Sequence, residues 1–194
     1  PDASQAARFM DDDRKVIEFG QEQFFPEAKM TDCRGRAVWW QTTKRPLLDA
    51  AGRPRYVLGI STDITARKQA EIFLHSVLQH LPIMVFIKDA ETLRFVMWNK
   101  AGEEISGFKN EEMLGKTDFD FFPPAEAARY VANDRETLAS DNILDVEEEF
   151  ISRDGTRRIM HTRKIPVRDA SGRALYLLGI AEDIPRRKAA ETSL

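Results

Sequence analysis

Residues 44–53 read KRPLLDAAGR, and residues 164–173 read KIPVRDASGR. The two stretches are 120 residues apart, and the alignment extends without a gap from residues 35–71 to residues 155–191. Eighteen of these 37 aligned positions are identical. Chance does not produce such identity, and the period is far longer than that of a solenoid repeat. The chain is therefore predicted to hold two tandem copies of one module.

The two copies differ in how much of the module they contain. With a slip of one residue, the match continues upstream between residues 6–14 and residues 127–135. The second copy has residues 74–123 ahead of this point, whereas the first copy starts almost at it. We therefore expect the first copy to be truncated and to lack the front half of the module.

Local patterns of the complete copy alternate between strand and helix signals. Short β-branched and aromatic runs predict strands, and capping residues, glycines and prolines delimit the helices. The expected strands are residues 84–88, 95–98, 145–152, 157–168 and 175–183, and the expected helices are residues 99–106, 110–114, 118–122 and 126–140. Hairpin signals join the last three strands. The predicted fold class is α+β, a five-stranded antiparallel sheet with short helices on one face.

A helix is expected between the copies, over residues 65–81, with Thr65 as its N-cap. Its apolar residues follow the spacing of a coiled-coil seam. The residues of this stripe are Ala70, Leu74, Val77 and Leu81. The helix either packs on its own domain or forms a seam between two chains, which would make the protein a homodimer. The expected domains are thus residues 1–64, the connecting helix 65–81, a complete module 82–185, and an outgoing helix from 186 to 194.

The composition is that of an ordinary soluble protein. A net charge of −3 gives no general attraction to nucleic acid or anionic lipid, so neither is expected as a partner. Cys33 is the single cysteine, and no internal disulfide can form. The longest apolar run, residues 81–87, is too short to span a bilayer, and no signal peptide opens the chain. We expect a cytoplasmic segment without membrane contact, in a parent protein that could be membrane-anchored.

The complete copy resembles the PAS family in four motifs that occur in the family's order. They are VMWNKA at 96–101, GFKNEEMLGK at 107–116, DFDFFP at 118–123, and the C-terminal PAC-type segment DASGRALYLLGIAEDI at 169–184. The family's segment ends in Asp-Ile-Thr, as residues 63–65 do, whereas the second copy has Pro185 in the threonine position. The resemblance covers residues 75–184 in full and residues 1–64 as a C-terminal half.

The resemblance implies a sensor and dimerisation module of bacterial signalling, such as a two-component system. Output domains in this family are commonly histidine kinases or diguanylate cyclases. The family's terminal aspartate couples the last strand to the outgoing helix, a role that falls here to Asp63 and Asp183, with Arg67 and Arg187 as ion-pair partners. A carboxylate at a helix N-terminus is favourable by about 0.3–1 kcal/mol. A plain surface capping contact is the alternative.

Modules of this family enclose a cavity between the sheet and the long helix. Candidate lining residues are Phe86, Trp98, Phe122, Tyr130, Met160 and His161. Large apolar side chains at such positions either fill the core or bind a small molecule. The sequence requires no cofactor: residues 75–184 contain no cysteine for a flavin adduct, and residues 125–140 contain no histidine for haem.

No catalytic or metal-binding motif is found. The step Gly115-Lys116-Thr117 lacks the earlier glycine of a phosphate loop, because position 110 is asparagine. His75 and His80 are spaced poorly for sharing a metal ion. The first hypothesis is therefore a non-catalytic sensing and dimerisation region that signals through its outgoing helix to an output domain, with a histidine kinase favoured. The alternative is a redox or gas sensor that holds flavin or haem.

The truncated copy carries a further expectation. Its three strands would leave one sheet edge and one apolar face open, and open edges pair with other strands. We expect this copy to complete itself against another copy or chain, or to be partly disordered.

Overall fold

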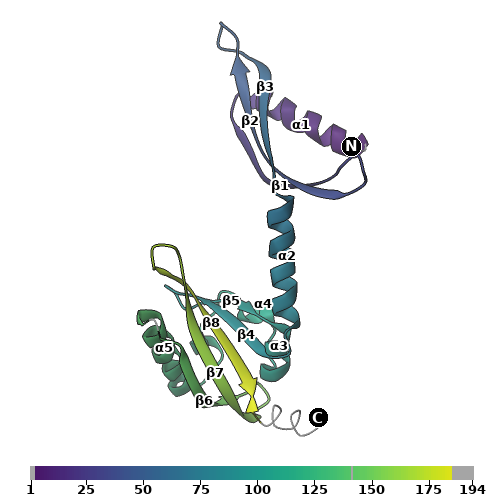
Figure 1. Ribbon diagram of the computed structural model, residues 1–194. Coiled ribbons are helices and arrows are strands. Elements are labelled where there is room, and N and C mark those ends of the chain that lie inside the picture. The colour runs from purple at the N-terminus through teal and green to yellow at the C-terminus, as the bar shows by residue number, and fades with distance from the viewer. Residues whose placement is uncertain (1–2, 141, 185–194) are drawn as a thin grey trace. The chain divides into compact units, whose positions relative to one another are not determined.

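The computed structural model describes residues 3–140 and 142–184 and divides into two compact units, residues 1–74 and 75–194 (Figure 1). The boundary falls inside helix α2 (Thr65–His80). The predicted outgoing helix, residues 186–194, lies outside the described residues.

The first unit is a helix packed on a three-stranded antiparallel sheet. Its elements are α1 (Ala3–Phe19), β1 (Gln23–Thr31), β2 (Ala37–Leu48) and β3 (Pro54–Asp63). The strand order is β1-β2-β3, and α1 contacts β2 and β3 on one face. Val16 of α1 is fully buried. Most of β3 is exposed, which leaves this unit with little core at that edge.

The second unit is an α+β module, as predicted. Its elements are β4 (Met84–Asp89), β5 (Phe95–Trp98), α3 (Lys100–Ser106), α4 (Asn110–Met113), the 3₁₀ turn η1 (Asp118–Asp120), α5 (Pro124–Ala139), β6 (Leu144–Ile151), β7 (Arg157–Arg168) and β8 (Ala174–Asp183). The five antiparallel strands run in the order β5-β4-β8-β7-β6. The core, with seven aromatic side chains, fills the space between this sheet and the helices.

The two sheets share one pairing register. Lys44 lies opposite Gly59 in β2–β3, and Lys164 lies opposite Gly179 in β7–β8. Both hairpins also shift register at the equivalent place, one residue before the end of β2 and of β7. The 120-residue offset of the sequence is thus kept in the hydrogen-bonded pairing.

The structure shows the bonds of the polar residues at three helix starts, and Thr65, expected as an N-cap, bonds to a strand instead. Asn99 precedes α3 as its N-cap and accepts a hydrogen bond from Gly102 N, so the helix starts at Lys100. Asn110 lies inside α4, and its side chain accepts from Trp98 N across to β5. The Thr65 hydroxyl accepts from Trp39 N of β2. In the last two cases a strand N–H competes successfully for the side-chain oxygen.

Among residues 3–140 and 142–184, no helix is both long enough and apolar enough to cross a membrane.

Candidate functional site

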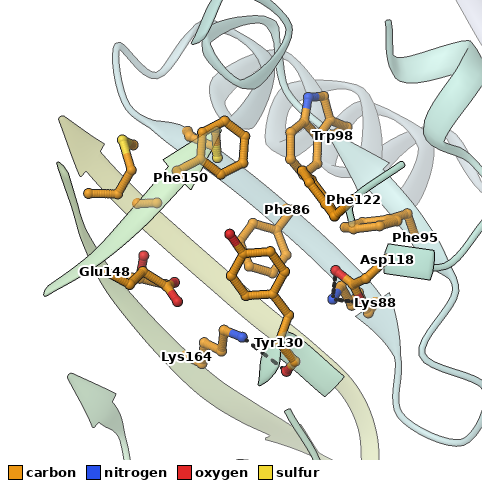
Figure 2. A pocket seen from close by; sticks show the side chains of 14 residues that line it. Phe86, Lys88, Phe95, Trp98, Asp118, Phe122, Tyr130, Glu148, Phe150 and Lys164 are labelled. Atoms are coloured by element: carbon orange, nitrogen blue, oxygen red, sulfur yellow. Dashed lines mark hydrogen bonds and ion pairs between the residues drawn. The ribbon is translucent and has the colours of Figure 1, made fainter. Parts of the chain in front are cut away.

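A small cavity lies in the second unit between the sheet and its covering helices (Figure 2). Its volume is about 40 Å³, room for roughly three water molecules. The lining residues are Met84, Phe86, Lys88, Phe95, Trp98, Asp118, Phe122, Tyr130, Glu148, Phe150, Met160, Thr162, Lys164 and Ala181. Six of the 14 lining residues are aromatic, and their rings make edge-to-face and stacked contacts.

The structure brings five of the six predicted pocket residues to this cavity, and the exception is His161. Neighbouring strand residues point to opposite faces, so His161 lies on the other face from Met160. Its Nε2 is hydrogen-bonded to Asp145 of β6, which also pairs with Arg163. His161 therefore belongs to a polar group on the outer face of the sheet.

A buried charge cluster, defined as Lys88, Asp118, Asp134 and Lys164, borders the cavity. Lys88 Nζ lies 2.6 Å from Asp118 Oδ2 and 2.6 Å from Asp134 Oδ2. Lys164 Nζ donates to Asp134 Oδ1 and, at 3.5 Å, to the carbonyl of Tyr130. All four side chains are at most 3% exposed. The cluster ties β4 and β7 to η1 and α5.

The cluster is electrically balanced, with two ammonium groups against two carboxylates. Lys88 Nζ also lies 4.6 Å from the centre of the Phe95 ring, a favourable cation–π distance. Burial raises the pKa of Asp118 above its ordinary value, and the Lys88 ammonium acts against that shift. Buried ion pairs of this kind fix the positions of the elements that carry them, because separating the partners leaves an unpaired charge in the core.

The sequence reasoning missed this cluster, although two signals for it were present. Lys88 has the strand parity of Met84 and Phe86, which places it on the core face of β4. Lys164 recurs as Lys44 in the repeat. Lysine is almost never fully buried without a partner, so the residue type alone predicts that Lys88 and Lys164 lie on the surface.

Glu148 supplies a second polar feature of the wall. Its Oε2 is buried and makes no hydrogen bond within the described residues, and Arg129 Nη2 lies 3.9 Å away. Burial, helped by the nearby Glu148 carboxylate, raises the pKa of Tyr130 to about 12. The cavity therefore presents a hydrogen-bond acceptor beside a neutral phenol.

The predicted relay residues Asp63 and Asp183 lie at the ends of β3 and β8. Asp183 accepts a 2.8 Å bond from Arg158 of β7, and Arg187 lies outside the described residues. Asp63 accepts from Thr65 N, and bonds from Thr65 hold the pKa of Asp63 below its usual range. Arg67 lies 3.8 Å from Glu71, one turn along α2. Both aspartates thus stand where a strand ends, and Asp63 bonds to Thr65 while Arg67 pairs with Glu71.

Asn99 is a junction that the sequence reasoning noted only as part of a motif. It is fully buried, and its Oδ1 accepts from Val85 N of β4. Its Nδ2 donates to the carbonyls of Ile83, at 2.8 Å, and Leu78, at 3.1 Å. One side chain therefore fastens the last turn of α2 to the sheet.

The predicted seam residues of α2 are largely solvent-exposed in the single chain. Leu74 is 59% and Val77 is 42% exposed, and α2 contains no buried residue. Ala70 is also exposed, and Leu81 is half-buried.

The cavity does not fit a flavin or haem with its side chains as they stand. Either ring system is many times larger than 40 Å³. The predicted pocket residue His161 faces away, and Cys33 lies in the first unit. Among the described residues no three His, Cys, Asp or Glu side chains are grouped to hold a metal ion.

The order of strands around an internal cavity, with helices on one face, is matched by a known family. The family profile described as PAS fold matches residues 1–69 and 78–189, which is most of the chain. The chain belongs to the PAS fold family. Both PAS-matching stretches contain the repeated β-hairpin.

Among curated proteins, this PAS chain is similar to sensor kinases. It is 28% identical over 127 residues to the aerobic respiration control sensor protein ArcB of Escherichia coli, covering 66% of this chain and 16% of ArcB. It is 34% identical over 110 residues to the methanogenesis regulatory histidine kinase FilI of Methanothrix harundinacea, covering 57% of this chain and 12% of FilI. The chain thus spans less than a fifth of these relatives.

Solved structures agree on the PAS fold. A PAS domain from Colwellia psychrerythraea matches with a TM-score of 0.53 and 16% identity, over 61% of this chain and 99% of that one. VqmA bound to DPO matches with a TM-score of 0.52 and 27% identity, over 58% of this chain and 57% of VqmA.

Proposed function

We propose that this chain is the signal-sensing and dimerisation region of a signal-transduction protein whose output domain, of the histidine kinase type, lies outside residues 1–194. The segment itself is not catalytic. The similarity to ArcB and FilI supports this reading.

The observation that carries the proposal is the buried charge cluster beside the cavity. It joins η1 and α5 to β4 and β7, so a small molecule or partner that disturbs the cavity must move the helices against the sheet. Strand β7 also carries Arg158, which holds Asp183 at the end of β8. Asp183 is the relay point in this proposal, because the chain continues from it toward the outgoing helix.

We also propose that the first unit is a partial copy of the same PAS module. Its support is the identical register of β2–β3 and β7–β8 and the separate family match to residues 1–69. In this organisation, α2 connects the copies and its stripe from Ala70 to Leu81 forms the homodimer seam.

The test joins residues 1–194, through a continuing helix, to a histidine kinase catalytic core. Autophosphorylation is expected to change at least severalfold on Lys88→Met, which breaks the charge cluster, and on Asp183→Asn, which removes the Arg158 pair. Lys109→Met is the control, because the Lys109 side chain is 70% exposed. Unchanged phosphorylation in both variants, with circular dichroism intact, would contradict the relay. A flavin or haem band in the visible spectrum would favour the cofactor-sensor alternative.

A further inference from the structure

Glu148 carries a buried carboxylate on the cavity wall whose hydrogen bonding is incomplete. Its side chain is 10% exposed, and its Oε2 makes no hydrogen bond to residues 3–140 or 142–184. The cation paired with it, Arg129, lies 3.9 Å away and donates instead to the carbonyl of Glu149, at 3.2 Å. Burying a carboxylate oxygen without a hydrogen bond is costly, so a donor on a bound molecule would stabilise it.

The internal repeat does not contain this carboxylate. Glu148 of β6 lies opposite Met160 of β7. The residue 120 positions before Met160 is Trp40 of β2, and Ala28 of β1 lies opposite it. The repeat does keep a lysine of the buried charge cluster, as Lys44. Glu148 is therefore a specific feature of the second unit's cavity, not a part of the framework that the two copies share.

The charges around the cavity favour a cation. The two lysines on its wall are held by carboxylates of the buried charge cluster, in which the charges cancel. Glu148 adds a negative charge to the wall, and Figure 2 shows its carboxylate directed toward the Tyr130 ring. The rings of Tyr130 and Phe150 pack edge to face with Phe122, at centre distances of 5.3 Å and 5.7 Å. Aromatic faces attract cations, so rings grouped near a carboxylate suit an organic ammonium ion.

The size of the cavity limits this ion to a few atoms. A volume of about 40 Å³ has room for roughly three water molecules. An ammonium group on a short alkyl chain has a similar size. Met84 and Met160, which also line the cavity and are at most 2% exposed, offer apolar surface for the alkyl part.

We propose that the cavity binds a compact organic ammonium ion whose N–H groups donate to Glu148 Oε2. The buried carboxylate then gains the donor that the described residues do not supply, and the aromatic rings and methionines enclose the alkyl part. An anion is excluded by the Glu148 charge. This inference names the ligand class of the sensing cavity and therefore rests on the proposed function.

The test titrates ethylammonium chloride into the full chain at pH 7 and constant ionic strength, and follows the methionine methyl signals by NMR. The signals of Met84 and Met160 are expected to shift, with a Kd of about 0.5 mM or weaker, because a ligand of three non-hydrogen atoms cannot bind more tightly. Met10, which is 66% exposed in the first unit, is the internal reference and should not shift. Ethanol and acetate, which are of similar size, are expected to bind about tenfold more weakly or less.

Two variants of β6 form a matched pair. Glu148→Gln keeps the size of the side chain and removes its charge, so it is expected to weaken ethylammonium binding about tenfold and to leave ethanol binding unchanged. Glu147→Gln removes the same charge from the outer face, where Glu147 lies opposite His161, and should bind ethylammonium as the wild type does. Unchanged ethylammonium binding by Glu148→Gln, with the Met160 signal at its folded position, would overturn the proposal.

The outcomes separate the ligand class from the sensing role. Equal binding of ethylammonium and ethanol by the wild type would overturn the ammonium assignment and leave the relay, which phosphorylation of Lys88→Met and Asp183→Asn tests independently. Shifts of Met10 as large as those of Met84 would also overturn it, since they would show an unspecific effect. Selective binding that leaves autophosphorylation of the fused kinase unchanged would confirm the ligand class and contradict the sensing role.

Discussion

The Phe86 ring occupies the space directly over Gly179, so that a Cβ atom on this glycine would lie 2.0 Å from Cζ of the ring. This contact joins β4 to β8 in the middle of the five-stranded sheet. Glycine is required at this position by a side chain that arrives from 93 residues earlier in the sequence.

Replacing Gly179 is therefore expected to destabilise the second unit. In Gly179→Ala, the Phe86 ring must move into a packed core, and overpacking of this kind costs about 1–3 kcal/mol or more. Gly59→Ala is the matched control, since its added methyl meets open space. Regional amide exchange gives the free energy of opening for each unit. Equal losses in the two variants would contradict the role assigned to Phe86.

The buried charge cluster predicts a second asymmetry between the units. Asp134→Asn deprives Lys88 and Lys164 of a shared carboxylate in the core, and breaking a buried pair costs about 3–5 kcal/mol. Asp13→Asn breaks the equivalent pair with Lys44, whose carboxylate is half exposed, and should cost about 1 kcal/mol or less. Urea unfolding with regional amide exchange measures both. A similar loss at Asp13 would show that the first unit is closed in solution.

Tyr130 predicts how stability varies at alkaline pH. The folded pKa of about 12 exceeds the ordinary value of 10.0, because burial disfavours the phenolate. Between these two values the folded state binds more protons than the unfolded state, so stability falls as pH rises through this window. The Tyr130→Phe variant is expected not to show this fall in stability between pH 10 and 12. The measurement compares the denaturation midpoints of the wild type and of Tyr130→Phe at pH 9 to 12. Midpoints of the two proteins that change in parallel over this range would contradict the prediction.

The exposed stripe of α2 predicts a solution dimer that charge can disrupt. Leu74→Arg places a cation in the proposed seam and is expected to shift the protein toward the monomer in light scattering. Ile72→Arg is the control, because Ile72 is equally exposed, at 59%, and lies two residues, about 200°, around the helix. Dissociation by both variants alike, or by neither, would argue against the seam.

The strands of the second unit could be predicted from the sequence, whereas its buried charge cluster could not. Strands β5 and β7 have the predicted bounds, and the other three strands of the second unit differ by one residue at one or both ends, because period-two patterns and turn residues are local signals. The charge cluster could not be found in this way. Lys88, Asp118 and Asp134 lie far apart in sequence, and only the packing of η1 and α5 against the sheet brings them together.

His161 also shows what local sequence patterns fail to predict. Its position in the strand was right, but its face was wrong, since one residue of parity separates the core face from the outer face. Thr65 was expected to cap its helix, and its hydroxyl instead accepts from the backbone N–H of Trp39 in β2.

By itself, the sequence determined the α+β class, the five strands of the second unit and the internal repeat, because hydrophobic period and turn chemistry act over a few neighbouring residues. Only the tertiary structure decided which charges are buried together and which glycine carries a ring above it. Those properties depend on elements that are distant along the chain but adjacent in space, where desolvation and packing set the energy.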